Sequence, residues 1–155
     1  MLLVPDHCAF VQSGVSIDVA GRDAHNVPVI GRAMGCRVSP DRERVTVFVS
    51  RQRSGRLLTA VASTRAVGVI FCHAGTHRAL QLKGSDAEVV AVTPDDLAQC
   101  RAATAAFVAN IASLGYTEER ARAEVNAPEQ DLVGVSFQVE SAFVQTPGPS
   151  AGARI

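Results

Sequence analysis

Residues 27–50 read VPVIGRAMGCRVSPDRERVTVFVS, and this stretch decides the fold. Valines at positions 45, 47 and 49 alternate with other residues, which predicts a strand over residues 44–50. The largely apolar run over residues 27–39 predicts a second strand. The polar segment 40–43 begins with a proline and predicts a tight turn between the two. Strands joined by so short a turn pair antiparallel.

The same signals continue on both sides of this hairpin. Val15, Ile17 and Val19 alternate with Ser16, Asp18 and Ala20, which predicts an earlier strand that ends at the turn-forming residues 21–26. Three more strands are predicted: residues 66–72, a long strand within residues 78–92 with a bend at Gly84, and residues 132–144. Strands in succession with short turns favour an antiparallel barrel over βαβ units.

Helices are predicted over residues 5–13, 54–64 and 94–124. The last region has the clearest signals, because Thr93 can cap a helix whose first residues are Pro94, Asp95 and Asp96. One apolar stripe follows it. Its members are Leu97, Cys100, Thr104, Phe107, Ile111 and Leu114. Gly115 is expected to stop this helix and Thr117 to start a short second one.

The 155 residues predict a single domain over residues 1–155, with an irregular tail from about residue 146. A net charge of zero argues against sequence-independent binding to nucleic acid. No apolar run is long enough for a membrane helix, and the N-terminus lacks the features of a signal peptide. We therefore expect a cytoplasmic protein.

The cysteines and histidines give no metal motif. Cys8, Cys36, Cys72 and Cys100 are too far apart for a zinc spacing, so we expect four reduced, structural thiols. His73 and His77 lie near Cys72, but no carboxylate or second cysteine joins them, and no metal site is predicted.

Polar residues at strand ends are the candidate binding residues. The segment Ser50, Arg51, Gln52, Arg53, Ser54 lies where a strand meets a helix, and helix N-termini and guanidinium groups both attract phosphate. A solvated loop with a serine cap explains the same residues equally well. Arg32 interrupts an apolar strand. Gln81 and Lys83 share one strand face that Arg78 cannot share, and a glutamine could bond to the edge of a flavin ring. The alternative is that Gln81 and Lys83 form the solvent-exposed face of an amphipathic strand.

Together these segments resemble the pyridoxamine 5′-phosphate oxidase-like flavin proteins, over about residues 15–92. The resemblance rests on three runs, in their order and spacing. They are Arg22-Asp23 followed by PVIGRAMG at residues 28–35, VTVFVS at residues 45–50 and THRALQLKG at residues 76–84. The tail FVQTPG at residues 143–148 is similar to that of small members of the same superfamily.

The resemblance implies an α+β, mainly β chain folded as a six-stranded antiparallel split β-barrel, which dimerises and binds two FMN molecules at the dimer interface. It implies that Arg32 contacts the phosphate end, that the backbone of Ala33 and Met34 lines the flavin ring, and that Gln81 reaches the ring edge with Lys83 nearby. Ser50, Arg51, Arg53 and Ser54 would hold the phosphate. His77 and Arg78 would lie at the open face, toward a small-molecule substrate.

Several functions stay open. The first is an FMN-dependent oxidoreductase in which the flavin carries the hydride chemistry, which needs no catalytic triad. The chain has no tryptophan, unlike the C-terminal segment of the family's vitamin-forming oxidases, which puts that particular activity in doubt. The alternatives are a flavin-binding carrier, sensor or electron-transfer protein, a barrel for deazaflavin or for haem with His73 or His77 as iron ligand, and an empty structural barrel.

Overall fold

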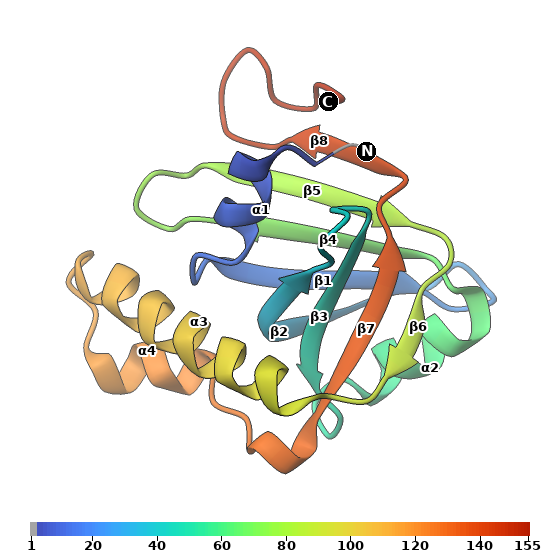
Figure 1. Ribbon diagram of the computed structural model, residues 1–155, viewed down its shortest axis with the longest axis horizontal. Helices are drawn as coiled ribbons and strands as arrows, with labels where there is room; N and C mark the ends of the chain where they lie inside the picture. The colour runs from blue at the N-terminus through green and yellow to red at the C-terminus, as the bar shows by residue number, and fades with distance from the viewer. Residues whose placement is uncertain (1–2) are drawn as a thin grey trace.

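The computed structural model describes residues 3–155 and consists of one eight-stranded antiparallel sheet with four α-helices (Figure 1). The strands are β1 (Ser16–Arg22), β2 (Pro28–Val38), β3 (Arg44–Ser50), β4 (Val67–Cys72), β5 (Ala79–Gly84), β6 (Glu88–Val90), β7 (Leu132–Gln138) and β8 (Ser141–Val144). The helices are α1 (Pro5–Val11), α2 (Gly55–Thr64), α3 (Pro94–Ala112) and α4 (Glu118–Glu124), and a 3₁₀ turn spans Glu129–Asp131. The order in the sheet is β6-β7-β3-β2-β1-β4-β5-β8.

The hairpin predicted from residues 27–50 is confirmed. β2 pairs with β3 and with β1, and the side chains of Val45, Val47 and Val49 are completely buried. β1 runs two residues further than predicted, because Arg22 still pairs with Pro28. The turn that follows is held by Asp23, whose carboxylate accepts the N–H groups of His25 and Val27.

The prediction of one long strand at residues 78–92 and another at residues 132–144 is wrong, because each region contains two strands. β5 pairs with β4 and β8, whereas β6 pairs with β7. Asp86 makes the break after β5: its carboxylate accepts the N–H of Gln138 and pairs with Arg44, which turns the chain toward the other half of the sheet. The sheet therefore has eight strands rather than six, and its antiparallel barrel character is as predicted.

The sheet closes on itself at Gly84. Strands β1, β4, β5 and β8 form one half and β2, β3, β7 and β6 the other, and the halves cross steeply (Figure 1). β7 and β8 belong to opposite halves, yet only Val139 and Glu140 separate them. A Cβ atom on Gly84 would lie 2.5 Å from the carbonyl oxygen of Gln138, so the strand ends touch backbone to backbone there.

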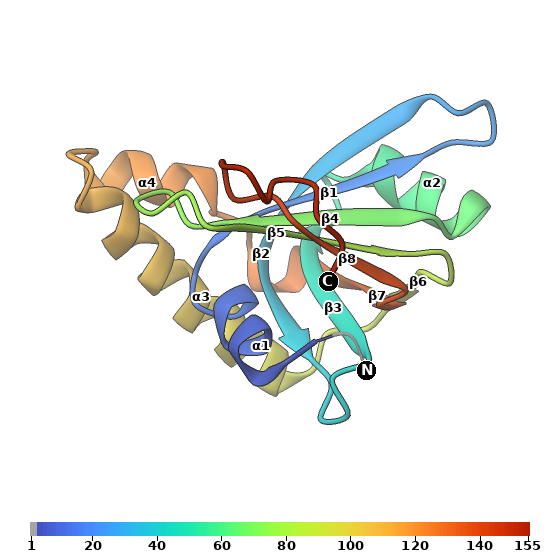
Figure 2. The same cartoon turned by 90° about the horizontal axis from the view of Figure 1, so that it is seen from above.

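Two helices complete the core inside this closed sheet. α1 contributes Phe10 and Val11, and α2 contributes Leu57 and Val61, to the cluster formed by the inward-facing residues of the strands. These helices lie at opposite ends of the barrel (Figure 2). Burial of these apolar side chains is the main stabilising contribution to the fold.

The helical region predicted over residues 94–124 is confirmed and packs outside the barrel. Thr93 and Asp96 form a reciprocal capping box at the start of α3, and Arg37 of β2 pairs with the buried Asp96 carboxylate at 2.8 Å. Phe107 packs with Phe48 and Met34 in a second apolar cluster. α3 ends at Ala112, so Leu114 lies in the connection to α4, and Thr117 caps α4 as predicted.

The structure also bears on two expectations from the sequence, the state of the cysteines and the lack of a membrane helix. All four cysteines are free thiols; Cys36 and Cys100 are buried, whereas Cys8 and Cys72 are half-buried. Among the helices of residues 3–155, none combines the length and the apolar character needed to cross a bilayer.

We expect Gly84→Ala to destabilise the protein by about 1–3 kcal/mol, because the new methyl group has no room at the barrel closure. Gly68→Ala is the matched control in the neighbouring strand β4, since its Cβ would meet only Lys83 Cγ at 3.9 Å. Its free energy of unfolding should change by less than about 0.5 kcal/mol. Denaturant titration measures both variants, and equal effects would contradict the backbone contact at Gly84.

The Asp86 turn predicts a pH dependence. Partial burial raises the pKa of Asp86, but the N–H of Gln138 and the Arg44 guanidinium outweigh it and hold the pKa below its ordinary value. The unfolded chain therefore takes up the proton first as pH falls, and the stabilisation by Asp86 is present above about pH 4 and lost as pH falls through the lower folded-state pKa. Asp86→Asn should be less stable than the unmodified protein at neutral pH, and the difference should shrink in acid. A constant difference down to about pH 2 would contradict this role.

Candidate functional site

The outward face of the sheet has a covered half and an open half. α3 and α4 cover outward-facing side chains of β2, β3 and β7, including Met34, Phe48 and Leu132. The outward side chains of β1, β2, β4, β5 and β8 that no helix covers form what we call the open face. They are Asp18, Ala20, Ile30, Arg32, Ile70, Gln81, Lys83, Ser141 and Phe143.

The strand register aligns several predicted site residues across this open face. Arg32 pairs with Asp18, Asp18 with Ile70, Ile70 with Gln81 and Gln81 with Phe143, so these residues form one row over five strands. Ala33 pairs with Val49, so Ser50 is the next residue of β3 beside Arg32. Lys83 lies in the adjacent row. The structure thus brings Arg32, Ser50, Gln81 and Lys83, which span 52 positions of sequence, to one face.

Contacts fix the polar side chains of the open face. Arg32 donates to the Ser16 hydroxyl at 2.9 Å and lies 3.6 Å from the Asp18 carboxylate, which neutralises its charge. The amide oxygen of Gln81 accepts from the Gln145 side chain at 3.3 Å, and within residues 3–155 the Gln81 NH₂ group has no acceptor and can donate to a ligand. The Lys83 ammonium lies 4.9 Å from the centre of the Phe143 ring.

The segment 50–54 is held in shape by Asp131, which lies about 80 positions away in the sequence. The Asp131 carboxylate accepts from the buried Ser50 hydroxyl and from the N–H of Gln52, and its carbonyl accepts from the N–H of Arg51. The Ser50 oxygen accepts in turn from the N–H of Arg53. Ser50 therefore uses its hydrogen bonds within the loop, and the arginine side chains project from it.

A hollow of about 470 Å³ lies where this loop enters α2. It is lined by Pro28, Val29, Ile30, Gln52, Arg53, Ser54, Gly55, Arg56 and Leu57. Arg51, Arg53 and Arg56 are exposed, and within residues 3–155 no carboxylate lies within ion-pair distance of them. Sequence reasoning missed Arg56, which lies in the first turn of the helix predicted over residues 54–64 and lines the same hollow as Arg53.

Four other predicted site residues lie elsewhere. The side chains of Ala33 and Met34 are buried, Ala33 in the barrel core and Met34 under α3, where a bulge in β2 turns it outward. Arg78 lies over the Phe10 ring at 4.3 Å and pairs with Asp6, so it fastens α1 to the turn between β4 and β5. His77 is exposed at the tip of that turn with φ of 57°.

Hydrogen bonds to His73, in the same turn, define which of its ring nitrogens carries the proton. Its Nδ1 accepts the N–H groups of Gly75 and Thr76, each at 3.2 Å. The neutral ring therefore carries its proton on Nε2 and has no lone pair there for a metal. Across residues 3–155, no group of three histidine, cysteine or acidic side chains is close enough together to hold a metal ion.

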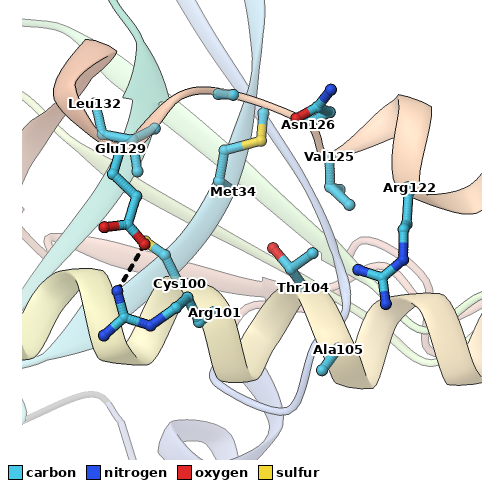
Figure 3. Close-up of a pocket in the computed structure, with 11 residues that line it drawn as sticks. Met34, Cys100, Arg101, Thr104, Ala105, Arg122, Val125, Asn126, Glu129 and Leu132 are labelled. Carbon is cyan, nitrogen blue, oxygen red and sulfur yellow. Dashed lines mark hydrogen bonds and ion pairs between the residues drawn. The ribbon is translucent and has the colours of Figure 1, made fainter.

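A further hollow of about 410 Å³ lies between α3 and the segment after α4, with Met34 on its floor (Figure 3). Arg101 pairs with Glu129 across its edge, as Figure 3 shows, and Arg122 pairs with Glu118. Burial raises the pKa of the Cys100 thiol in this hollow to about 12, so the thiol is protonated at neutral pH. This hollow offers neither a reactive thiolate nor an unpaired arginine.

The fold is found in known structures. HupZ from Group A Streptococcus superposes with a TM-score of 0.57 at 18% identity, over 97% of this chain and all (100%) of that one. The haem storage protein HutZ from Vibrio cholerae gives 0.52 at 18%, over 93% and 95% of the two chains. A pyridoxamine 5′-phosphate oxidase-related, FMN-binding protein from Nostoc punctiforme gives 0.51 at 9%, over 96% and 87%.

This chain has the split-barrel fold. The fold class expected from the sequence resemblance is confirmed by these superpositions. No protein-family model matches the sequence. No curated protein matches it either. At identities of 9–18% the likeness is one of fold, and the split barrel's ligand has to be inferred from its own residues.

We predict that Asp131→Ala lowers the free energy of unfolding by about 2 kcal/mol, because it leaves the buried Ser50 hydroxyl and the loop N–H groups without their acceptor. Glu129→Ala is the matched control in the same 3₁₀ turn, since it removes only an exposed ion pair with Arg101 worth less than about 1 kcal/mol. Thermal or denaturant unfolding compares the two. A smaller loss for Asp131→Ala than for Glu129→Ala would contradict the loop assignment.

Proposed function

We propose that this split barrel binds FMN on its open face and uses it for hydride or electron transfer with a small substrate. The observation that carries the proposal is a continuous path along β2. It leads from the unpaired arginines at the start of α2, past the exposed Ile30, to the row that contains Arg32 and Gln81. The stretch of β2 from Pro28 to Arg32 is about 13 Å long, and together with the hollow at α2 it suits an extended ligand with a phosphate at one end.

The start of α2 fits a phosphate. The N–H groups of Gly55, Arg56 and Leu57 have no partner within the described chain, as expected for a first helical turn. Arg53 and Arg56 line the same hollow, and Arg51 projects from the loop that precedes it. Free N–H groups, a positive helix end and guanidinium groups together favour an anion. Ser50 and Ser54 are buried and contribute by holding the loop and its approach to β2.

The open face fits a flat ring system. Gln81 keeps an NH₂ donor, unpaired within the described residues, for a ring carbonyl or nitrogen. Ile70 within the row and Ile30 beside it offer apolar surface. Bound FMN supplies hydride transfer, so these side chains need only bind and orient the ring and exclude water. Because Asp18 already balances the charge of Arg32, we propose that Arg32 donates to the ring instead of the phosphate end predicted from the resemblance, and that the arginines near α2 bind the phosphate.

We infer that a second copy of the chain covers the open face. Ile30, on β2 at one side of this face, is 72% exposed, and Phe143, on β8 at the other side, is only partly buried. Apolar side chains on a sheet face that no helix covers favour association. A two-fold dimer through this face would enclose two FMN sites. The cytoplasmic location, the single domain and the absence of a nucleic-acid partner stay predictions.

Haem is the second candidate, because one similar structure is that of a haem storage protein. His77 would be the iron ligand in that case, since the hydrogen bonds of His73 occupy its Nδ1 and place the proton on Nε2. The three unpaired arginines suit a phosphate better than a porphyrin edge, and FMN is the ligand that the chain favours. A flavin carrier or sensor would bind in the same way and show no turnover with a nicotinamide donor.

The double substitution Arg51→Ala with Arg53→Ala should weaken FMN binding at least about a hundredfold, because each charged hydrogen bond to phosphate contributes about 1.5–3 kcal/mol. Quenching of FMN fluorescence on titration measures the dissociation constant. Arg101→Ala with Arg122→Ala removes the same charge from α3 and α4 and should leave the constant unchanged. Equal affinities for the two double variants would overturn the phosphate site.

A further inference from the structure

A separate hollow of about 560 Å³ lies in the angle between the open face and the α3–α4 hairpin. We call it the hairpin hollow. Its lining is Ser16, Asp18, Arg32, Cys72, Ala74, Phe107, Ile111, Leu114, Tyr116, Arg120, Ala121 and Glu124. The volume lies within the range of small-molecule sites. It shares Arg32 with the proposed ring site and none of the residues of the hollow at α2.

One wall of the hairpin hollow is apolar. Phe107 and Ile111 come from the stripe of α3, and Leu114 and Tyr116 from the connection to α4. Leu114 is 46% exposed and Tyr116 is 50% exposed, so a bound ligand would bury apolar surface of both side chains that is now in contact with water. An aromatic ring beside aliphatic side chains suits a flat apolar body.

The charges of the hollow leave one cation free. Asp18 and Arg32 balance each other at 3.6 Å. Arg120 lies over the Tyr116 ring at 5.6 Å, and no carboxylate of the described chain is within ion-pair distance of it. Arg101 and Arg122 on the same two helices are both paired with glutamates. Arg120 is therefore the arginine of the hairpin that is available to an anionic group.

Two further groups limit what can bind. Glu124 follows Arg120 by one helical turn and has no cationic partner within the described residues, so it disfavours a ligand with a second negative charge. Burial and the nearby Asp18 raise the pKa of the Cys72 thiol, which is protonated at neutral pH and contributes a neutral contact.

We propose that the hairpin hollow binds a flat, apolar acid with a single carboxylate, the ring against Phe107, Ile111 and Leu114 and the carboxylate on Arg120. The site stands on its own geometry; that its occupant is the substrate of the flavin rests on the proposed function. Arg32 lies in both sites, so the ring of such an acid would be next to the bound flavin.

The test uses two probes of one shape, 2-naphthoate and its neutral amide 2-naphthamide, titrated by calorimetry into the flavin-free protein. One naphthoate should bind per chain. Its affinity should be about tenfold higher than that of the amide, because the carboxylate gains one charged hydrogen bond. Equal affinity for the two probes, or no binding of the acid, would overturn the proposal.

Variants locate the probe. In Arg120→Gln, naphthoate should bind no more tightly than the neutral amide, so the preference of about tenfold is lost. Arg122→Gln is the matched control on the same helix, and it should keep that preference because Arg122 points to Glu118. Leu114→Asp, at an exposed position, should weaken both probes. A preference that survives Arg120→Gln would overturn the assignment, and thermal unfolding midpoints establish that each variant is folded.

The flavin function is tested apart from the site. With FMN added, naphthoate should perturb the visible absorption of the flavin, and this change should be absent in Arg120→Gln. If the protein binds naphthoate through Arg120 but takes up no FMN, the acid site is supported and only the flavin function fails. If FMN binds and naphthoate does not, the acid site is overturned and the flavin function stands.

Discussion

The fold depends on the close approach of β5 to β7 at Gly84, where the backbone leaves no room for a side chain. The β1–β2 ladder joins the two halves of the sheet on one side, and this contact closes the barrel on the other, although β5 and β7 are not paired in a ladder. The Asp86 turn directly after it sends the chain from one half to the other. Closure there also gives the sheet an inside, filled by apolar side chains, and an outside on which Arg32, Gln81 and Lys83 lie.

The helices that cover part of the outer sheet face determine which of its side chains remain accessible to a ligand. α3 and α4 shield β2, β3 and β7, and the rest of the outer face remains open. Because β1 and β4 lie between β2 and β5 in the sheet, the register places Arg32 and Gln81 in one row, although 49 positions separate them in the sequence. α2 closes one end of the barrel and turns its N-terminus, with three unpaired arginines nearby, toward the start of β2. The proposed phosphate site and the proposed ring site thus rest on one arrangement.

Local signals in the sequence predicted most of the elements. Alternating valines located β1 and β3, and Thr93 with Pro94 located the start of α3. The apolar pattern also continued through Gly84 and through Val139, where only tertiary contacts break the strands, and so two long strands were predicted in place of four short ones. Residues 50–54 were predicted from the sequence as a candidate phosphate site, which stays a prediction. The support of this loop by Asp131 and the neutralisation of Arg32 by Asp18 depend on tertiary pairings that a local pattern does not contain.

The central claim is that the open face holds FMN, and the visible absorption spectrum of the purified protein tests it most directly, with mass identification of any chromophore that is released and with FMN added where none is present. We predict flavin absorption bands and one FMN per chain. A protein that stays colourless and takes up no FMN, or one whose chromophore is haem, would contradict the account of the ligand and leave the barrel itself in place.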